Sequence, residues 1–466
     1  MTSSDSHNHR HAANAFAGWQ PRTREGLVCV DRRGMLKAGL AGIAGLSLAD
    51  LFRAQAAKVS AGEVPLNQRS VILLWMTGGP SHIDMWDPKP DAPKEIRGPF
   101  NTISTALPGV AICEHMPRHA AMLNKFTLIR SIDARESNHE PNMVMQTGNR
   151  EAEPRLNPLG HMYPAIGAVV SKFRGAERPG IPAYAATMRD KSHLAWGGWL
   201  GKEFDPFILN QSSGAFQLPK QLSLARLADR QTLLKDFDGL RKDLDRSGSM
   251  QSLDVFSKQA VELVTGKKAR EAFDISRESD ATRERYTNHP WCQQALLARR
   301  LVEAGVAFVT LDLSHHSASG TWDTHGDDIP PYGGIQSGLK PLLPVFDHLI
   351  TTLVSDLEER GLLDKTLVVA MGEFGRSPRM SQFDGRNHWP DAMTICLAGG
   401  GMKHGQVIGS SERDGGKPKD RPVTPAEIAA TIYQYMGVPL DWAYLDSRGR
   451  PRLIVEENAR PIGDLV

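Results

Sequence analysis

The chain has 466 residues, of which 40% are hydrophobic and 23% charged, and its formal net charge at pH 7 is +2. This composition is typical of a globular protein with a large core, and the nearly balanced charge excludes a strong attraction to nucleic acid or to anionic lipid. The four cysteines form no Cys-x-x-Cys pair, which excludes a zinc knuckle and a thioredoxin-type motif; they are Cys29, Cys113, Cys292 and Cys396.

The N-terminal segment is typical of an export signal. Residues 1–30 are polar and are predicted to be disordered. The pair Arg32-Arg33 then precedes an apolar run over residues 38–48 and a small-residue site at residues 54–56. Paired arginines, a short apolar run and an A-x-A site, in that order, are features of a twin-arginine signal peptide.

A membrane anchor is the alternative interpretation of this segment. The apolar run holds 11 residues, whereas a spanning helix needs about 20. We therefore expect residues 1–56 to be removed after export, with no stable membrane span, and the remaining domain, residues 57–466, to reach the periplasm or the cell surface. With Cys29 in the signal segment, three cysteines remain and allow at most one disulfide.

Predicted strands and helices alternate along the remaining chain. Apolar runs bounded by turn formers predict strands over residues 68–76, 126–130, 306–313, 365–371 and 394–398. Apolar residues at helical spacing predict helices over residues 116–123, 141–146, 163–173, 290–304, 339–360 and 425–436. This alternation predicts an α/β fold with a doubly wound, mostly parallel sheet. The charged stretch 218–285 has leucines at helical spacing and no strand signal, so we predict a helical insertion there.

Ionisable side chains cluster directly after the predicted strand 365–371. Glu373 and Arg376 lie in a glycine-rich turn, and Arg386 and His388 follow. Ligands of open α/β sheets bind beyond the carboxyl ends of the strands, so a functional site is expected here. A surface loop in which glutamate and arginine pair is the alternative.

Two other segments follow predicted strands. The turn at residues 78–80 lets backbone N–H groups face an anion, although a plain turn is an alternative. Ser137, Asn138 and His139 lie where a helix is expected to begin, and a helix N-terminus favours an anionic group. An ordinary helix cap is the alternative there.

The segment after the strand 306–313 is rich in metal-ligand types. Asp323 and His325 are two residues apart and can face one divalent ion, although a simple Asp–His hydrogen bond is the alternative. With Glu373 and His388, these residues supply enough imidazole and carboxylate groups for a metal centre.

At these residues the chain resembles the secreted, twin-arginine-exported proteins known as domain of unknown function 1501, within the alkaline phosphatase and sulfatase superfamily. The resemblance rests on the order and spacing of six motifs, over residues 74–82, 87–90, 297–305, 322–325, 372–376 and 385–390. It implies a doubly wound, alkaline phosphatase-like α/β fold that hydrolyses phosphate or sulfate esters at a metal centre.

The resemblance also implies roles for individual residues. The superfamily's nucleophile begins a helix that ends about ten residues later at a Thr-Gly pair. Counting back from Thr147-Gly148 gives Asn138 at the nucleophile position. Ser137 or His139 could take that position only if the register is shifted by one residue. Thr77 and Gly78 stand where the first metal-binding aspartate is usual. Glu373 keeps the carboxylate of a later Asp-His pair without its imidazole.

The mid-chain Asp and His of the superfamily resemble either Asp323 with His325 or Asp312 with His316, and its final metal-binding His matches His388. One metal site is therefore better preserved than the other, and a two-metal displacement is not favoured.

We expect from this an exported hydrolase-like protein that binds one divalent ion, zinc, manganese or calcium, and acts on a phosphate or sulfate ester. The candidates are Glu373, Ser137 and His139 for catalysis, Arg376, Arg386 and Asn138 for substrate binding, and Asp323, His325 and His388 for the metal. The alternative is a non-catalytic cell-surface protein that binds an anionic glycan or a protein partner, and a purely structural surface protein is a third possibility.

Overall fold

The computed structural model of the protein describes residues 65–139, 142–178, 180–209, 271–317, 319–327, 331–456 and 459–465. The predicted signal peptide, residues 1–56, lies outside the described residues. Of the predicted helical insertion, only residues 271–285 are described.

A central sheet of eight strands has the order β12-β4-β11-β8-β1-β7-β5-β6. Its strands are β1 Ser70–Trp75, β4 Phe126–Ile132, β5 Tyr184–Thr187, β6 Phe207–Ile208, β7 Phe308–Asp312, β8 Thr366–Met371, β11 Met393–Gly399 and β12 Gln406–Ile408. Within this sheet, β11 runs antiparallel to both of its neighbours, β4 and β8, and the other pairings are parallel. The predicted α/β fold with a mostly parallel sheet is confirmed.

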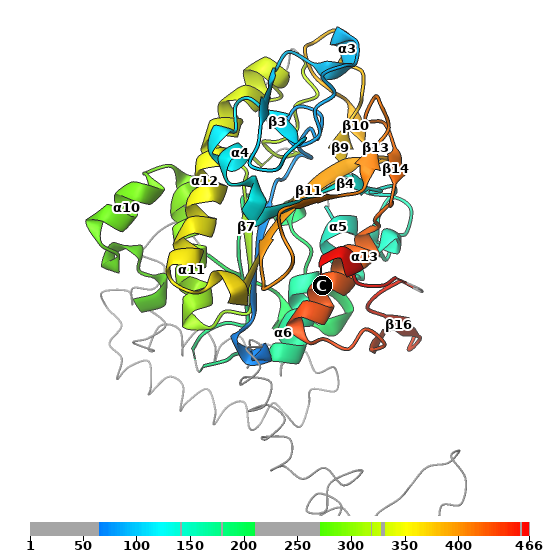
Figure 1. Cartoon of the computed structure of the whole chain (residues 1–466). Helices are drawn as coiled ribbons and strands as arrows, with labels where there is room; N and C mark the ends of the chain where they lie inside the picture. The colour runs from blue at the N-terminus through cyan, green and yellow to red at the C-terminus, as the bar shows by residue number, and fades with distance from the viewer. Residues whose placement is uncertain are drawn as a thin grey trace, which may run out of the picture. The chain divides into compact units, whose positions relative to one another are not determined.

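Helices cover both faces of the sheet. The α-helices are α3 Lys94–Arg97, α4 Pro117–Ala121, α5 Val144–Thr147, α6 Ile166–Arg174, α10 Asp280–Tyr286, α11 Pro290–Ala304, α12 Lys340–Glu359 and α13 Pro425–Met436. Helices α11 and α12 lie on one side of the sheet, and α5, α6 and α13 lie on the other (Figure 1). This is the doubly wound arrangement that the alternating pattern predicts.

Residues of β1 alternate between two hydrophobic cores. Ile72 and Leu74 belong to the core that includes residues of α11 and α12, whereas Val71 and Leu73 belong to the core that includes residues of α6 and α13. Because successive side chains of a strand point to opposite faces, a strand covered on both faces must be apolar throughout. The predicted strands are continuous apolar runs for this reason.

Short turns and two-stranded ribbons complete the described fold. The 3₁₀ helices are η2 Leu66–Gln68, η3 Leu123–Lys125, η4 Arg150–Ala152, η5 Gly160–Met162, η6 Lys191–His193, η7 Gly198–Leu200, η8 Lys202–Phe204, η9 Ile275–Arg277, η11 Leu363–Lys365 and η12 Gly463–Leu465, and η10 Ile335–Leu339 is a π turn that leads into α12. The ribbons pair β2 Thr102–Ser104 with β3 Ala111–Cys113, β9 Gly375–Arg376 with β10 His388–Trp389, β13 Ser410–Ser411 with β14 Pro418–Asp420, and β15 Ala443–Leu445 with β16 Pro451–Leu453.

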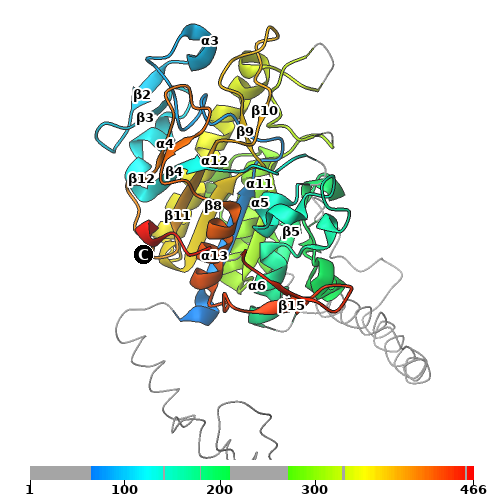
Figure 2. The same cartoon turned by 90° about the vertical axis from the view of Figure 1, so that its right-hand side faces the viewer.

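The ribbon β9–β10 marks the end of the molecule that carries the candidate site. It pairs His388 with Arg376, and Figure 2 shows it at the same end of the sheet as α3. Because Arg376 follows β8 by a few residues, this is the end at which the parallel strands finish.

One predicted helix differs in a way that matters for the site. The helix expected over residues 141–146 is observed as α5 Val144–Thr147, and the left-handed backbone of Gly148 (φ 68°) closes it. Ser137, Asn138 and His139 therefore lie in the loop between β4 and α5 and do not cap a helix.

The described part of the chain also bears on the expected absence of a membrane span and on the state of the cysteines. Within it, no helix has the length and apolar character needed to cross a membrane. Cys113, Cys292 and Cys396 are all buried free thiols.

Candidate metal centre

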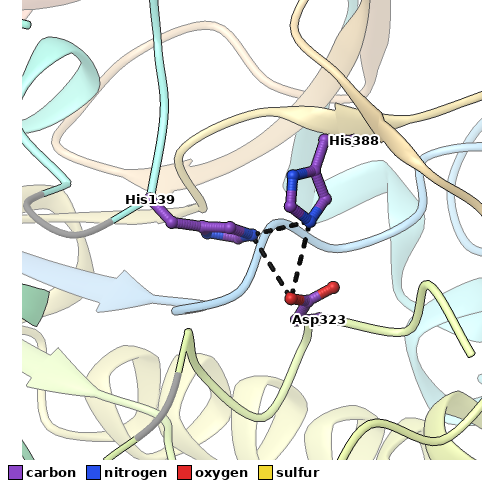
Figure 3. A group of neighbouring side chains, drawn as sticks. All are labelled: His139, Asp323 and His388. Carbon is purple, nitrogen blue, oxygen red and sulfur yellow. Dashed lines mark hydrogen bonds and ion pairs between the residues drawn. The ribbon is translucent and has the colours of Figure 1, made fainter. Parts of the chain in front are cut away.

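Three side chains from separate loops meet beyond the carboxyl ends of the strands. His139 follows β4, Asp323 follows β7, and His388 lies in β10. His139 Nε2 is 3.1 Å from His388 Nε2 and 3.4 Å from Asp323 Oδ2, and His388 Nε2 is 3.5 Å from Asp323 Oδ2. Figure 3 shows the two imidazole rings and the carboxylate turned toward one another. The three donor atoms form a compact triangle that could hold a metal ion.

The size of this triangle fits a transition-metal ion. Ligands about 2.0–2.1 Å from a tetrahedral zinc ion stand about 3.3–3.4 Å apart, and the measured separations are 3.1, 3.4 and 3.5 Å. Two imidazole nitrogens and one carboxylate oxygen suit zinc or manganese, whereas calcium takes oxygen ligands. The donor set therefore favours zinc or manganese and disfavours calcium among the three predicted ions.

One member of the triangle is partly exposed to solvent. The side chains of His139 and Asp323 are buried, whereas the side chain of His388 is 43% exposed. Three protein ligands with solvent access leave a further coordination position free, as in catalytic zinc sites, whereas structural zinc sites have four protein ligands.

Asp323 is fixed through the oxygen that does not face the two histidines. Its Oδ1 lies 2.7 Å from His325 Nδ1 and 2.7 Å from a guanidinium nitrogen of the buried Arg376. Burial alone raises the pKa of Asp323, but the Arg376 cation and the surrounding histidines outweigh burial and hold the pKa far below its usual range. The carboxylate is therefore ionised, with Oδ2 free to bind a cation.

His139 is held in the same manner by a second carboxylate. Its Nδ1 is 2.6 Å from Oε1 of the fully buried Glu373, whose two oxygens accept the backbone N–H of Gly78 at 2.9 and 3.1 Å. Burial lowers the pKa of His139, but the hydrogen bonds to Asp323 and Glu373 outweigh burial and raise it above its ordinary value. The turn at residues 78–80 was predicted to face an anion, and the anion that it contacts is the Glu373 carboxylate.

The structure brings together two of the three predicted ligands, Asp323 and His388, and places His139 with them in the position expected for His325. Both ring nitrogens of His325 contact carboxylates, Nδ1 at 2.7 Å from Asp323 Oδ1 and Nε2 at 3.1 Å from Asp327 Oδ2. His325 therefore lies beside the triangle, on the far oxygen of Asp323. The hydrogen bond to Asp323 raises the pKa of His325.

Asp312, the alternative ligand from the resemblance, belongs to a different network. It ends β7 and accepts hydrogen bonds from Thr77 Oγ1 at 2.5 Å and from the backbone N–H of Arg189 at 2.7 Å. Its Oδ2 also lies 2.9 Å from Nδ1 of the buried His193. His193 was not a candidate from the sequence, since it lies in a 3₁₀ turn without a motif around it. His316 is the partner that the resemblance implied for Asp312, and its pKa is lowered by burial.

The remaining candidates from the β4–α5 loop lie next to His139. Ser137 is buried, and its hydroxyl has no hydrogen-bond partner among the described residues. Asn138 Oδ1 accepts the backbone N–H of His139 at 2.9 Å. Glu136 has a left-handed backbone (φ 71°), a conformation that costs a non-glycine residue free energy and that shapes the turn leading to His139.

Both arginines predicted to bind the substrate are internal. Arg376 donates to the carbonyls of Gly78 and Gly79 in addition to its contact with Asp323. Arg386 forms an ion pair with Asp84, with Nε 2.6 Å from Oδ2, and donates to the carbonyl of Ile96 at 2.7 Å. Arg386 thus joins separate segments of the chain in the interior and is fully buried, so its guanidinium group is not exposed to a substrate.

Solved structures of other proteins are similar to this chain at low sequence identity. Among solved structures, the chain is similar to the PsFucS1 sulfatase of Pseudoalteromonas sp., at 13% identity and a TM-score of 0.37 over 83% of this chain and 70% of that chain. It is also similar to the lipoteichoic acid synthase LtaP of Listeria monocytogenes, at 9% identity and a TM-score of 0.34 over 80% and 72% of the two chains. A third similar structure is the phosphonate monoester hydrolase SpPMH of Silicibacter pomeroyi, at 12% identity and a TM-score of 0.33 over 74% and 71%.

A search of curated proteins gave no match. A family model described as protein of unknown function, DUF1501, matches residues 68–466. This range contains all the residues of the metal centre and nearly all of the described fold. The chain therefore belongs to the DUF1501 family.

Proposed function

We propose that the protein is a hydrolase that binds one divalent transition-metal ion through His139, Asp323 and His388 and cleaves a phosphate or sulfate ester. The observation that carries the proposal is the convergence of three donor atoms, each within 3.5 Å of the other two, with one ligand exposed to solvent. The reaction class comes from the resemblance of the sequence motifs to the alkaline phosphatase and sulfatase superfamily.

The charges around the triangle support an anionic substrate. Asp323 and Glu373 supply two carboxylates, and Arg376 supplies one guanidinium, so these groups leave one negative charge. A divalent ion would reverse the sign and leave one positive charge, which favours an ester that carries negative charge. When bound, the ion supplies a Lewis acid toward the ester and toward a water molecule.

The protein's own residues prepare the site for that chemistry. Asp323 is kept ionised by Arg376 and presents Oδ2. His139 is buried and is oriented by Glu373, whereas His388 stands at the solvent side. Substrate would therefore approach past His388.

A second function, binding of an anionic glycan or a protein partner without catalysis, is supported by a separate observation. Arg376 and Arg386, the two arginines predicted to bind the substrate, have their guanidinium groups bonded to carboxylates and carbonyls inside the protein. Ser137, the hydroxyl candidate predicted from the β4–α5 loop, is buried. A site built in this way could bind an anion and lack turnover.

The test is metal content combined with hydrolysis. The purified chain, reconstituted with zinc or manganese, should retain about one ion per chain and hydrolyse an aryl phosphate or aryl sulfate, and His388→Ala and Asp323→Asn should lose both properties. His404→Ala is the matched control, because His404 hydrogen-bonds Thr127 and Gly399 at the opposite end of β4 and β11. Stoichiometric metal without turnover on either ester class would favour the binding function, and no bound metal would reject the metal-dependent hydrolase.

We also propose that residues 1–56 direct export of the folded chain. The support is the order of the Arg32-Arg33 pair, the apolar run and the small-residue site. Replacement of both arginines by lysine should retain the chain in the cytoplasm of a bacterial host, measured by fractionation against the unchanged chain. Equal export of the two chains would contradict a twin-arginine signal.

A further inference from the structure

Glu373 is the most completely enclosed carboxylate next to the metal centre. It is fully buried, its two oxygens share the N–H of Gly78, and Oε1 lies 2.6 Å from His139 Nδ1. It is not a member of the donor triangle. A buried carboxylate needs such partners because burial without them is costly.

The two ring nitrogens of His139 have different partners. Nδ1 faces Glu373, whereas Nε2 faces His388 and Asp323. An ionised carboxylate accepts hydrogen bonds and cannot donate them, so a neutral imidazole in this position carries its proton on Nδ1. Nε2 is then left with its lone pair directed toward the centre of the triangle.

We propose that Glu373 is a positioning residue: it fixes the ring orientation and the tautomer of His139, and so completes the metal site, without itself contacting the metal or the substrate. The inference rests on the proposed function, because it assumes that the triangle binds a metal ion. Carboxylates that hold the second nitrogen of a metal-binding histidine typically contribute 10- to 100-fold to metal affinity.

The turn after β1 supports both sides of this arrangement. The N–H of Gly78 holds the Glu373 carboxylate, and a Cβ on Gly78 would overlap the backbone of Trp322 and Asp323. Gly78 also has a left-handed backbone (φ 118°). The same turn therefore holds Glu373, which contacts His139, and also contacts the loop that carries Asp323.

The test compares zinc binding by the unchanged chain and by Glu373→Gln. The glutamine amide has one accepting oxygen, and its NH2 group meets either Gly78 N–H or His139 Nδ1–H, both donors. We expect the zinc dissociation constant, measured by isothermal titration, to rise about 10- to 100-fold. Asp347→Asn is the matched control, because Asp347 is also a buried carboxylate that accepts backbone N–H groups, from Arg118 at 3.1 Å and His119 at 2.6 Å, and is not a member of the triangle. The control should bind zinc within about 2-fold of the unchanged chain.

A second variant and a second readout separate positioning from general stability. Glu373→Asp keeps the charge but is one methylene shorter, so it cannot hold Gly78 and reach His139 together, and it should also weaken zinc binding. Cobalt bound in place of zinc should show altered visible absorption bands in both variants and unchanged bands in Asp347→Asn, since the bands report ligand geometry.

The outcomes distinguish this inference from the proposed function. If Glu373→Gln binds zinc and shows cobalt bands like the unchanged chain, the positioning role is overturned and the metal site remains. If Glu373→Gln does not fold, the same results for Glu373→Asp would overturn the positioning role. Failure of the unchanged chain to bind zinc would overturn the proposed function and this inference together. Weaker binding of the same size in Asp347→Asn would show that lost stability explains the effect, and would also overturn the positioning role.

Discussion

The ion pair between Arg386 and Asp84 is fully buried, so we expect the stability of the fold to depend on it. Both side chains are removed from solvent, and Arg386 also donates to three carbonyls, those of Ile96, Ser377 and Pro378. Removal of one partner of a buried pair leaves an uncompensated charge, which costs about 3–5 kcal/mol. We expect Arg386→Ala to lower the free energy of unfolding by about that amount in denaturant titrations.

Arg379→Ala is the control for this prediction. Arg379 is 76% exposed, and its contact with Glu95 is 3.9 Å long, so its removal should change stability by less than about 0.5 kcal/mol. If Arg386→Ala kept full stability and instead lost affinity for an anionic ligand, Arg386 would be the anion-binding residue that the sequence predicts.

The buried His119 is expected to make the stability of the fold depend on pH. Its ring packs against Phe126 and Trp86, its Nδ1 has no hydrogen-bond partner among the described residues, and burial lowers its pKa to about 3. In the unfolded chain this histidine takes up a proton near pH 6.5, about its unperturbed pKa. In the folded chain it takes up the proton only near its lowered pKa of about 3. Between these pH values the unfolded state binds more protons, so stability falls as pH falls, by up to about 1.4 kcal/mol per pH unit.

The measurement is urea unfolding at several pH values from about 7.5 to 4.5. His119→Phe should lose less stability on acidification than the unchanged chain, whereas replacement of the exposed His161 by Phe should leave the slope unchanged. Parallel slopes for the unchanged chain and His119→Phe would contradict a neutral buried His119.

The residues of the metal centre show what a sequence pattern can and cannot specify. Asp323 and His388 were predicted as ligands because each follows a strand within a motif rich in metal-ligand types, and the structure brings them together. The third member was predicted as His325, two residues from Asp323, but the nearby histidine bonds the other carboxylate oxygen, and His139 arrives from a loop 184 residues away. Spacing along the chain does not determine which oxygen of a carboxylate a neighbour faces.

The turn that follows β1 supports the site, and alanine at Gly78 tests this support. Gly78 and Gly109 both have left-handed backbones, with φ of 118° and 76°, so alanine strains each of them. A Cβ at Gly109 meets nothing, whereas a Cβ at Gly78 overlaps the backbone that carries Asp323. We expect Gly78→Ala to cost about 1–3 kcal/mol more than Gly109→Ala, with weaker zinc binding in the Gly78 variant alone.

Denaturant titration and zinc titration of the two variants check this prediction. Equal losses of stability would mean that the contact at Gly78 relaxes without cost. Zinc binding retained in Gly78→Ala would mean that the turn does not support the site.

Local signals account for the elements that were predicted well. Helices α11 and α13 have the predicted bounds because each begins with a proline and ends at a left-handed glycine, Gly305 or Gly437. The strands β5, β6 and β12 were not predicted, since they are two to four residues long and lie toward the edges of the sheet. Short edge strands depend on pairing with a neighbour, which a local pattern does not contain.

The order and direction of the strands explain why the site forms at one end of the sheet. The alternation of strands and helices predicts a parallel sheet, and a parallel sheet gathers its carboxyl ends at one edge. It does not predict that β11 enters antiparallel between β4 and β8, or that β10 folds back onto β9 so that His388 lies over the ends of the strands. Those features depend on contacts between distant segments.

The metal centre joins these distant segments, so metal binding should stabilise the whole fold. His139, Asp323 and His388 are separated by 184 and 65 residues, and an unfolded chain does not hold such donors together. Binding to the folded state alone adds about 2.7 kcal/mol to the free energy of unfolding when free zinc is 100 times its dissociation constant. We expect that gain in urea titrations of the metal-free chain with added zinc, and no gain in His388→Ala, which lacks one of the three donors. An equal gain in the variant would contradict the prediction, because the stabilising zinc ion would then not need His388 and would bind elsewhere.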